Sequence, residues 1–177
     1  MIAPAQVQRH NNGKGKLQRG FTLIDLLVSL AILAILLAVA IPSLSDVFLS
    51  SKLGSYANNL VASAHLARSE AIKSNVAVIM CASTNGTTCG AGGWESGWIV
   101  LNGVNVIQRQ QSEMKGYKIT ESTGLTRLSF QASGVGATQA TLTVCRAEPT
   151  AGKEERVVDI SATGKPSVSK TATGNCA

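Results

Sequence analysis

The sequence predicts an α+β fold in which a long, kinked N-terminal helix packs on a small antiparallel β-sheet domain, arranged as two short sheets with disulfides. An almost unbroken apolar run covers residues 21–41. A stripe of apolar residues at helical spacing, which begins with Leu44, Val47 and Phe48, then continues to about residue 74. From residue 76 onward, apolar and polar residues alternate in short runs, which is the period of β-strands. An apolar helix face and an apolar sheet face can cover each other, which favours this architecture.

The first 20 residues are a polar leader that carries Arg9, Lys14, Lys16 and Arg19 and no acidic residue. The whole chain has 16 basic and 10 acidic residues and a formal charge of +6. Without the four basic residues of the leader, the rest of the chain is close to neutral. The isoelectric point of about 9.4 therefore gives little support to a nucleic-acid-binding domain.

The apolar run from Phe21 to Ile41 contains only three polar residues, Thr22, Asp25 and Ser29. About 20 apolar residues are enough for a helix to span a membrane. Because the basic residues all precede the run, the positive-inside rule places the N-terminus in the cytoplasm and the rest of the chain in the periplasm. A secretory signal cleaved near "AVAIPSL" is the alternative, and it would remove the run.

The helical pattern continues past Pro42, where a lost backbone hydrogen bond predicts a kink. We expect residues 21–44 to form the transmembrane and assembly segment and residues 45–75 an amphipathic continuation, with Asn75 as the C-cap. His65 is the only histidine outside the leader. It falls on the apolar stripe and is predicted to be a partly buried structural residue.

Residues 76–177 are predicted to form the β-rich globular domain. The Asn102–Gly103 pair between two of its expected strands is a two-residue hairpin signal. The expected strands cover residues 76–80, 97–101, 104–108, 117–120, 127–130, 140–146 and 156–161.

The four cysteines, Cys81, Cys89, Cys145 and Cys176, all lie in the part of the chain expected outside the cytoplasm, which indicates two disulfides. Three pairings are possible. We favour Cys81–Cys89, which closes a short loop, with Cys145–Cys176, which holds the C-terminus. Loop entropy makes these bonds worth roughly 2.6 and 3.7 kcal/mol. A zinc site is disfavoured because the spacings lack the usual CxxC pairs.

The stretch "RGFTLIDLLVSLAILAIL" resembles the class III signal of type IV pilins and type II secretion pseudopilins. The resemblance implies that a prepilin peptidase cuts after Gly20 and that the new N-terminus, Phe21, is methylated. A second block, "LARSEAIKSNVAVIMCAS" followed by "GGWESGWIV", is similar to FimT/FimU-type minor pilins and the GspH pseudopilin. A pilin-like fold is therefore expected.

The family usually has glutamate at the fifth mature position, where this chain has Asp25. In the family this acid pairs with the N-terminal amine of a neighbouring subunit. A carboxylate in the first helical turn is stabilised by the helix dipole by about 0.3–1 kcal/mol. An unpaired carboxylate at mid-bilayer costs about 2.5–3.5 kcal/mol, and pairing with the amine would recover this cost. The alternative is that Asp25 lies at the membrane edge among lipid headgroups.

The resemblance implies a minor type IV pilin precursor that moves from the inner membrane into the pilus, assembles with other minor pilins and the major pilin, and helps to prime or cap the tip. One alternative is a GspH-like pseudopilin of a type II secretion system. Another is an anchored periplasmic domain that never polymerises.

A third alternative is a DNA-uptake pilin, because some FimT-type proteins bind DNA through a C-terminal Gly-Arg-x-Arg motif. The stretch "TGKPSVSK" matches in part at Gly164 and Lys165, but Ser167 replaces the second arginine. Lys165 and Lys170 are the candidate phosphate contacts. Two lysines predict only weak, salt-sensitive binding, and a solvated tail held by Cys176 is favoured.

We expect neither enzymatic activity nor a cofactor or metal. The sequence has no Gly-x-Ser-x-Gly motif, and the glycines at 90–93 do not lead into a helix. Trp94 and Trp98 have the spacing of residues on one side of a strand and are predicted to be core residues.

Overall fold

The computed structural model describes residues 21–90, 92–111, 114–149, 151–174 and 176. The chain divides into two compact units, Met1–Pro42 and Ser43–Ala177, which are described separately. Helix α1, Leu23–Ser74, contributes residues to both units. The kink predicted at Pro42 concerns the placement of one unit relative to the other, so it stays a prediction. Among the described residues, no helix combines the length and apolarity needed for a membrane crossing.

The end of α1 agrees with the sequence prediction. Asn75 follows the last helical residue and has a φ angle of 54°, the left-handed conformation typical of a helix C-cap. Asparagine tolerates this conformation better than most residues because its short polar side chain makes local hydrogen bonds. The chain therefore leaves the helix at this point and enters the sheet domain.

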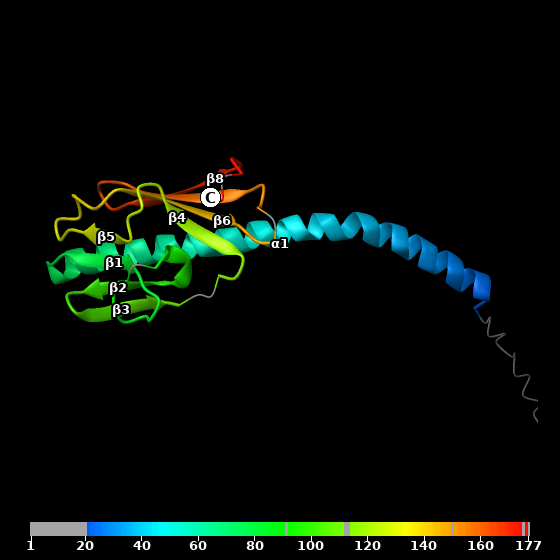
Figure 1. Ribbon diagram of the computed structural model, residues 1–177, viewed down its shortest axis with the longest axis horizontal. Helices are drawn as coiled ribbons and strands as arrows, with labels where there is room; N and C mark the ends of the chain where they lie inside the picture. Colours follow the sequence, from blue (N-terminus) through cyan, green and yellow to red (C-terminus); the bar gives the residue numbers. More distant parts are fainter. Residues whose placement is uncertain (1–20, 91, 112–113, 150, 175, 177) are drawn as a thin grey trace, which may run out of the picture. The chain divides into compact units, whose positions relative to one another are not determined.

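The second unit contains two antiparallel four-stranded sheets and the short 3-10 helix η1, Trp94–Ser96 (Figure 1). The first sheet has the order β3-β2-β1-β5, and the second has the order β4-β6-β7-β8. The strands of the first sheet are β1 Val78–Ala82, β2 Trp98–Asn102, β3 Asn105–Gln110 and β5 Arg127–Phe130. Those of the second sheet are β4 Tyr117–Glu121, β6 Ala140–Arg146, β7 Glu155–Ile160 and β8 Pro166–Thr171.

Each of the seven predicted strands is present, with ends shifted by at most two residues. Strand β1 starts two residues later than predicted because Asn75 ends the helix and the chain needs two residues to reach the sheet. The predicted hairpin is also present. Asn102 pairs with Asn105, so Gly103 and Val104 form the loop, and Gly103 has the positive φ of 60° that such a turn requires.

Strand β8 corrects the expectation of a solvated tail after Gly164. It pairs with β7 over its full length, from Glu155–Thr171 to Ile160–Pro166. The run has one aliphatic residue, Val168, and it starts with a proline, so no alternating pattern marks it. A strand at the edge of a sheet needs only one partner, and proline is tolerated there.

The core of the second unit lies along the part of α1 that the sheets cover (Figure 1). The buried helix face consists of Leu49, Leu53, Ala57, Leu60, Ala64, Ala67 and Ala71. The indole nitrogen of Trp98 on β2 donates to the Ser63 hydroxyl at 2.9 Å, with both residues buried. On the other side of the helix, Arg156 on β7 donates to Ser50 at 2.8 Å, so α1 contacts both sheets.

Two expectations about this helix face were wrong. Leu44, Val47 and Phe48 were placed on the stripe but are at least 56% exposed, because the buried face begins only at Leu49. His65 is exposed rather than partly buried. Its neighbour Ala64 lies on the covered face, and the next residue of an α-helix points about 100° away from it.

The two disulfides join Cys81 to Cys89 and Cys145 to Cys176, the pairing that loop closure favoured. The first closes the loop that follows β1. The second ties the C-terminal segment to β6 and therefore holds the end of the chain beside the second sheet.

Candidate assembly site

The first turn of α1 is organised by a reciprocal pair of hydrogen bonds between Thr22 and Asp25. The backbone amide and the hydroxyl of Thr22 donate to Oδ2 of Asp25 at 3.1 and 2.6 Å. The backbone amide of Asp25 donates to the Thr22 hydroxyl at 3.3 Å. This is a capping box with aspartate as the acid. The sequence prediction did not include Thr22, although the T-x-x-D spacing before an apolar run is the signal for it.

The capping box fixes the orientation of the Asp25 carboxylate. No described residue donates a hydrogen bond to its second oxygen, Oδ1, and the residue is exposed. Phe21, which precedes the capping box, is 92% exposed. The helix dipole favours a negative charge at this end of α1. Oδ1 is thus accessible to a cation from outside the chain. Gly20 lies outside the described residues.

An apolar surface follows directly after Asp25. The large side chains from Leu23 to Leu37 are all at least 47% exposed. The surface also carries Ala31 and Ala34, small residues of the kind that allow close approach between helices. Exposed apolar surface of this extent marks a site of contact with protein or lipid.

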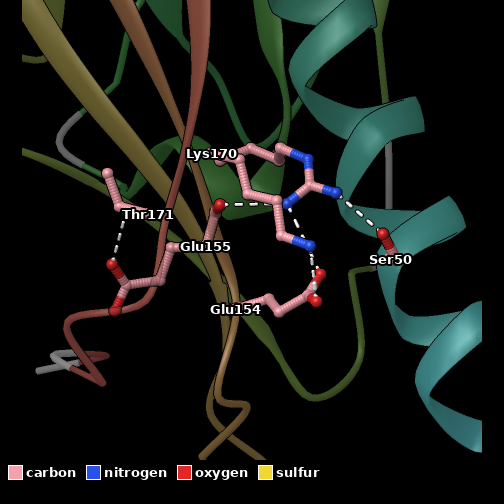
Figure 2. A network of polar contacts seen from close by, with 6 residues as sticks. Ser50, Glu154, Glu155, Lys170 and Thr171 are labelled. Atoms are coloured by element: carbon pink, nitrogen blue, oxygen red, sulfur yellow. Dashed lines mark hydrogen bonds and ion pairs between the residues drawn. The ribbon is translucent and has the colours of Figure 1, made fainter.

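A second polar cluster connects α1 to the second sheet in the globular unit (Figure 2). Figure 2 shows the Lys170 side chain directed at Glu154, with 2.6 Å between Nζ and Oε1. The Arg156 guanidinium lies 3.6 Å from the other Glu154 oxygen and donates to Ser50 on α1. The hydrogen bond from Lys170, together with its charge and that of Arg156, lowers the pKa of Glu154.

This cluster changes the interpretation of the two candidate DNA contacts. Lys170 is paired with Glu154, so its ammonium group already has an anionic partner within the chain. Lys165 lies exposed in the turn between β7 and β8. The sequence did not reveal the Lys170–Glu154 pair, because the two residues are brought together by the unpredicted pairing of β8 with β7.

The two tryptophans are core residues, as predicted, but Trp94 lies in η1 rather than on a strand. Its indole nitrogen donates to the carbonyl of Leu125 at 2.8 Å. Within the described part of the chain, no group of three or more His, Cys, Asp and Glu residues is placed to hold a metal ion.

The long helix with an exposed apolar N-terminal part, together with the two antiparallel sheets, defines a pilin-like protein. A family model described as type II transport protein GspH matches residues 56–164, and a model of the prokaryotic N-terminal methylation motif matches residues 15–41. The chain belongs to the GspH family. It is therefore a minor pilin or pseudopilin of the type IV pilus or type II secretion kind.

Solved structures of one minor pilin agree with this fold, and a pseudopilin is also similar. The type IV minor pilin FimU of Pseudomonas aeruginosa PAO1 matches in two crystal forms. In the P21 form it is 22% identical with a TM-score of 0.54, covering 68% of this chain and 90% of that chain. In the P65 form it is 24% identical with a TM-score of 0.50, covering 66% and 92%. The minor pseudopilin EpsH of the Vibrio cholerae type II secretion system is 18% identical with a TM-score of 0.48, covering 70% and 98%. No curated protein sequence matches the chain.

Proposed function

We propose that the chain is the precursor of a minor type IV pilin, a structural subunit that helps to prime or cap the pilus tip. In this proposal a prepilin peptidase cuts after Gly20, Phe21 is methylated, and residues 21–44 hold the subunit in the inner membrane before assembly with other minor pilins and the major pilin. The observation that carries the proposal is the exposed apolar helix surface that begins at the capping box of Asp25.

Cleavage at Gly20 would supply a cation for Asp25, which has no cationic partner among the described residues. It creates an ammonium group on Phe21, and packing of helices side by side brings the ammonium of one subunit near the carboxylate of the next. Thr22 already holds Oδ2, so Oδ1 is the oxygen that would accept from the neighbour. Insertion scales assign about 2.5–3.5 kcal/mol to an unpaired aspartate at mid-bilayer, and pairing would recover much of this cost.

The test is expression of the full chain with and without a prepilin peptidase, followed by N-terminal sequencing and filament shearing. We expect a methylated Phe21 N-terminus only when the peptidase is present. Asp25→Ala should be processed but absent from sheared filaments, whereas Asp25→Glu should be incorporated. Thr22→Val is the matched control, because it removes the two hydrogen bonds of the Thr22 hydroxyl and keeps both the backbone amide bond and the carboxylate. Equal incorporation of Asp25→Ala and wild type would contradict the proposal.

A GspH-like pseudopilin is the second candidate, favoured by the family model over residues 56–164. Deletion of the gene distinguishes the two, since loss of pili with normal protein secretion supports the pilus, and the reverse supports the secretion system. Binding of DNA through Lys165 is a weaker alternative. Gel shifts of DNA with the protein at low and high salt test this alternative. If Lys165 binds DNA, Lys165→Gln should remove the shift.

A further inference from the structure

The end of the globular unit where α1 terminates holds an arginine between two glycine turns. A Cβ atom on Gly134 would lie 3.2 Å from Cδ1 of Ile72 and 3.7 Å from Nη2 of Arg68. A Cβ atom on Gly164 would lie 3.2 Å from Cδ of Arg68. Both glycines have a positive φ, so the close approach depends on turns that other residues rarely adopt. We name the following residues the Arg68 cluster: Arg68, Ile72, Gly134, Val135, Gly164 and Lys165.

The guanidinium of Arg68 has no counterion in the part of the chain that the structure describes. Its Nε atom is buried and makes no hydrogen bond. The acid two residues further along the helix, Glu70, is paired instead with Lys73 at 3.6 Å. Lys165, next to Gly164, is exposed and adds a second positive charge. A partly buried cation is costly unless it is paired, so the cluster favours an anionic group from outside the chain.

The surroundings of Arg68 are aliphatic. Ile72 is 49% exposed and Val135, beside Gly134, is 55% exposed. Arginine is enriched among the residues that contribute most to protein–protein binding, and the exposed aliphatic side chains beside it supply apolar surface that a partner can cover. A guanidinium also fits a carboxylate through two parallel hydrogen bonds, which gives the contact a defined geometry.

We propose that the Arg68 cluster is a docking surface for an acidic segment of an adjoining pilin subunit, in which an Asp or Glu side chain binds Arg68 and neighbouring apolar side chains cover Ile72 and Val135. The inference rests on the proposed function, because it requires assembly. A nucleic-acid backbone would meet the same two cations. Two cations are few for phosphate binding, and the exposed aliphatic side chains match a protein partner better.

The test is zero-length carbodiimide crosslinking of the full chain in cells that make its co-assembling pilins, followed by mass spectrometry of the filament fraction. Carbodiimide joins a carboxylate to an amine only when the two are in contact. Arg68→Lys places an amine at this position and keeps the aliphatic stem that packs on Gly164. We expect links from this amine and from Lys165 to an Asp or Glu of a neighbouring pilin. Arg109→Lys, at an exposed arginine on β3, is the matched control and should give no such link.

Arg68→Met keeps the stem but removes the charge. It should lower the yield of the Lys165 link about tenfold, since the loss of an interfacial charge pair costs at least the equivalent of one decade in affinity. Intact disulfides and an unchanged melting temperature of Arg68→Met exclude misfolding as the cause of a lower link yield. If Arg68→Met misfolds, the inference is tested by the link from Arg68→Lys alone.

Three results would overturn the inference. The first is equal linking by Arg68→Lys and Arg109→Lys. The second is an undiminished Lys165 link in well-folded Arg68→Met. The third is DNA retention that depends on Arg68 without any pilin link. Absence of the wild-type chain from the filament fraction overturns the proposed function and this inference with it. Presence of the chain without a link at position 68 overturns this inference alone.

Discussion

Two glycines with similar φ angles but different surroundings allow the tightness of packing at the Arg68 cluster to be measured. Gly164 and Gly103 have φ angles of +69° and +60°. A Cβ on Gly103 would meet nothing within 4 Å, whereas one on Gly164 would lie 3.1 Å from Phe130, 3.2 Å from Arg68 and 3.3 Å from Ala137. Alanine at either position suffers the same left-handed backbone strain. Only Gly164→Ala also compresses its neighbours.

The expected magnitudes follow from these two effects. The left-handed conformation costs an alanine roughly 1–2 kcal/mol, which applies to both variants. Overpacking adds about 1–3 kcal/mol to Gly164→Ala alone. For a unit of this size, 1 kcal/mol corresponds to a shift in melting temperature of about 4 °C. Gly164→Ala should therefore melt about 4–12 °C below Gly103→Ala.

The assay is thermal unfolding of the detergent-solubilised chain, followed by near-ultraviolet circular dichroism of the two buried tryptophans. Gly124→Ala serves as a second open control, because this glycine has a φ of +78° and no neighbouring atom within 4 Å of its ideal Cβ. It should melt close to Gly103→Ala. Equal melting temperatures for Gly164→Ala and Gly103→Ala would refute the reasoning about packing at this end.

Three further variants test other contacts. Ser63→Ala leaves the Trp98 indole without its acceptor and should lower the free energy of unfolding by about 1–3 kcal/mol, measured by urea titration. Burial raises the pKa of Glu121, but hydrogen bonds from Thr123, Leu125 and Thr141 outweigh burial, so the folded pKa lies below its usual value of 4.5. The ionised carboxylate of Glu121 therefore stabilises the folded state above pH 4.5, and this stabilisation is lost as the pH falls through the folded pKa. Glu121→Gln should make the melting temperature less dependent on pH in this acidic range. Lys170→Met should raise the pKa of Glu154 towards its usual range in a carboxyl titration followed by NMR; an unchanged pKa would contradict the ion pair.

The local patterns of the sequence predicted most of the fold. Helical spacing gave the length of α1, and the period of two gave seven strands, because each of these elements buries one face. Strand β8 was missed because its outer positions face solvent and its residues carry no alternation. The exposed Leu44, Val47 and Phe48 were misplaced for a related reason. Their spacing fits the stripe, but only the tertiary structure shows where the sheets begin to cover the helix.

The site was predictable only where its signal is local. Asp25 stands out as an acid in an apolar run, and its partner Thr22 lies three residues away. The pairing of Lys170 with Glu154 depends on a strand pairing that the sequence did not reveal. The surroundings of Arg68, which has no counterion among the residues that the structure describes, depend equally on the positions of two distant turns. Such features require knowledge of which segments meet in space.

The buried face of α1 has a consequence for how this protein can vary. Four alanines on α1 are fully buried, namely Ala57, Ala64, Ala67 and Ala71. Their methyl groups therefore set how closely the helix and the sheets approach each other. A larger side chain at any of them would push a whole sheet outward, and a glycine would weaken the helix. We therefore expect substitutions to be tolerated at the outward helix positions and in the loops, whereas substitutions at these four alanines should change the distance between the helix and the sheets.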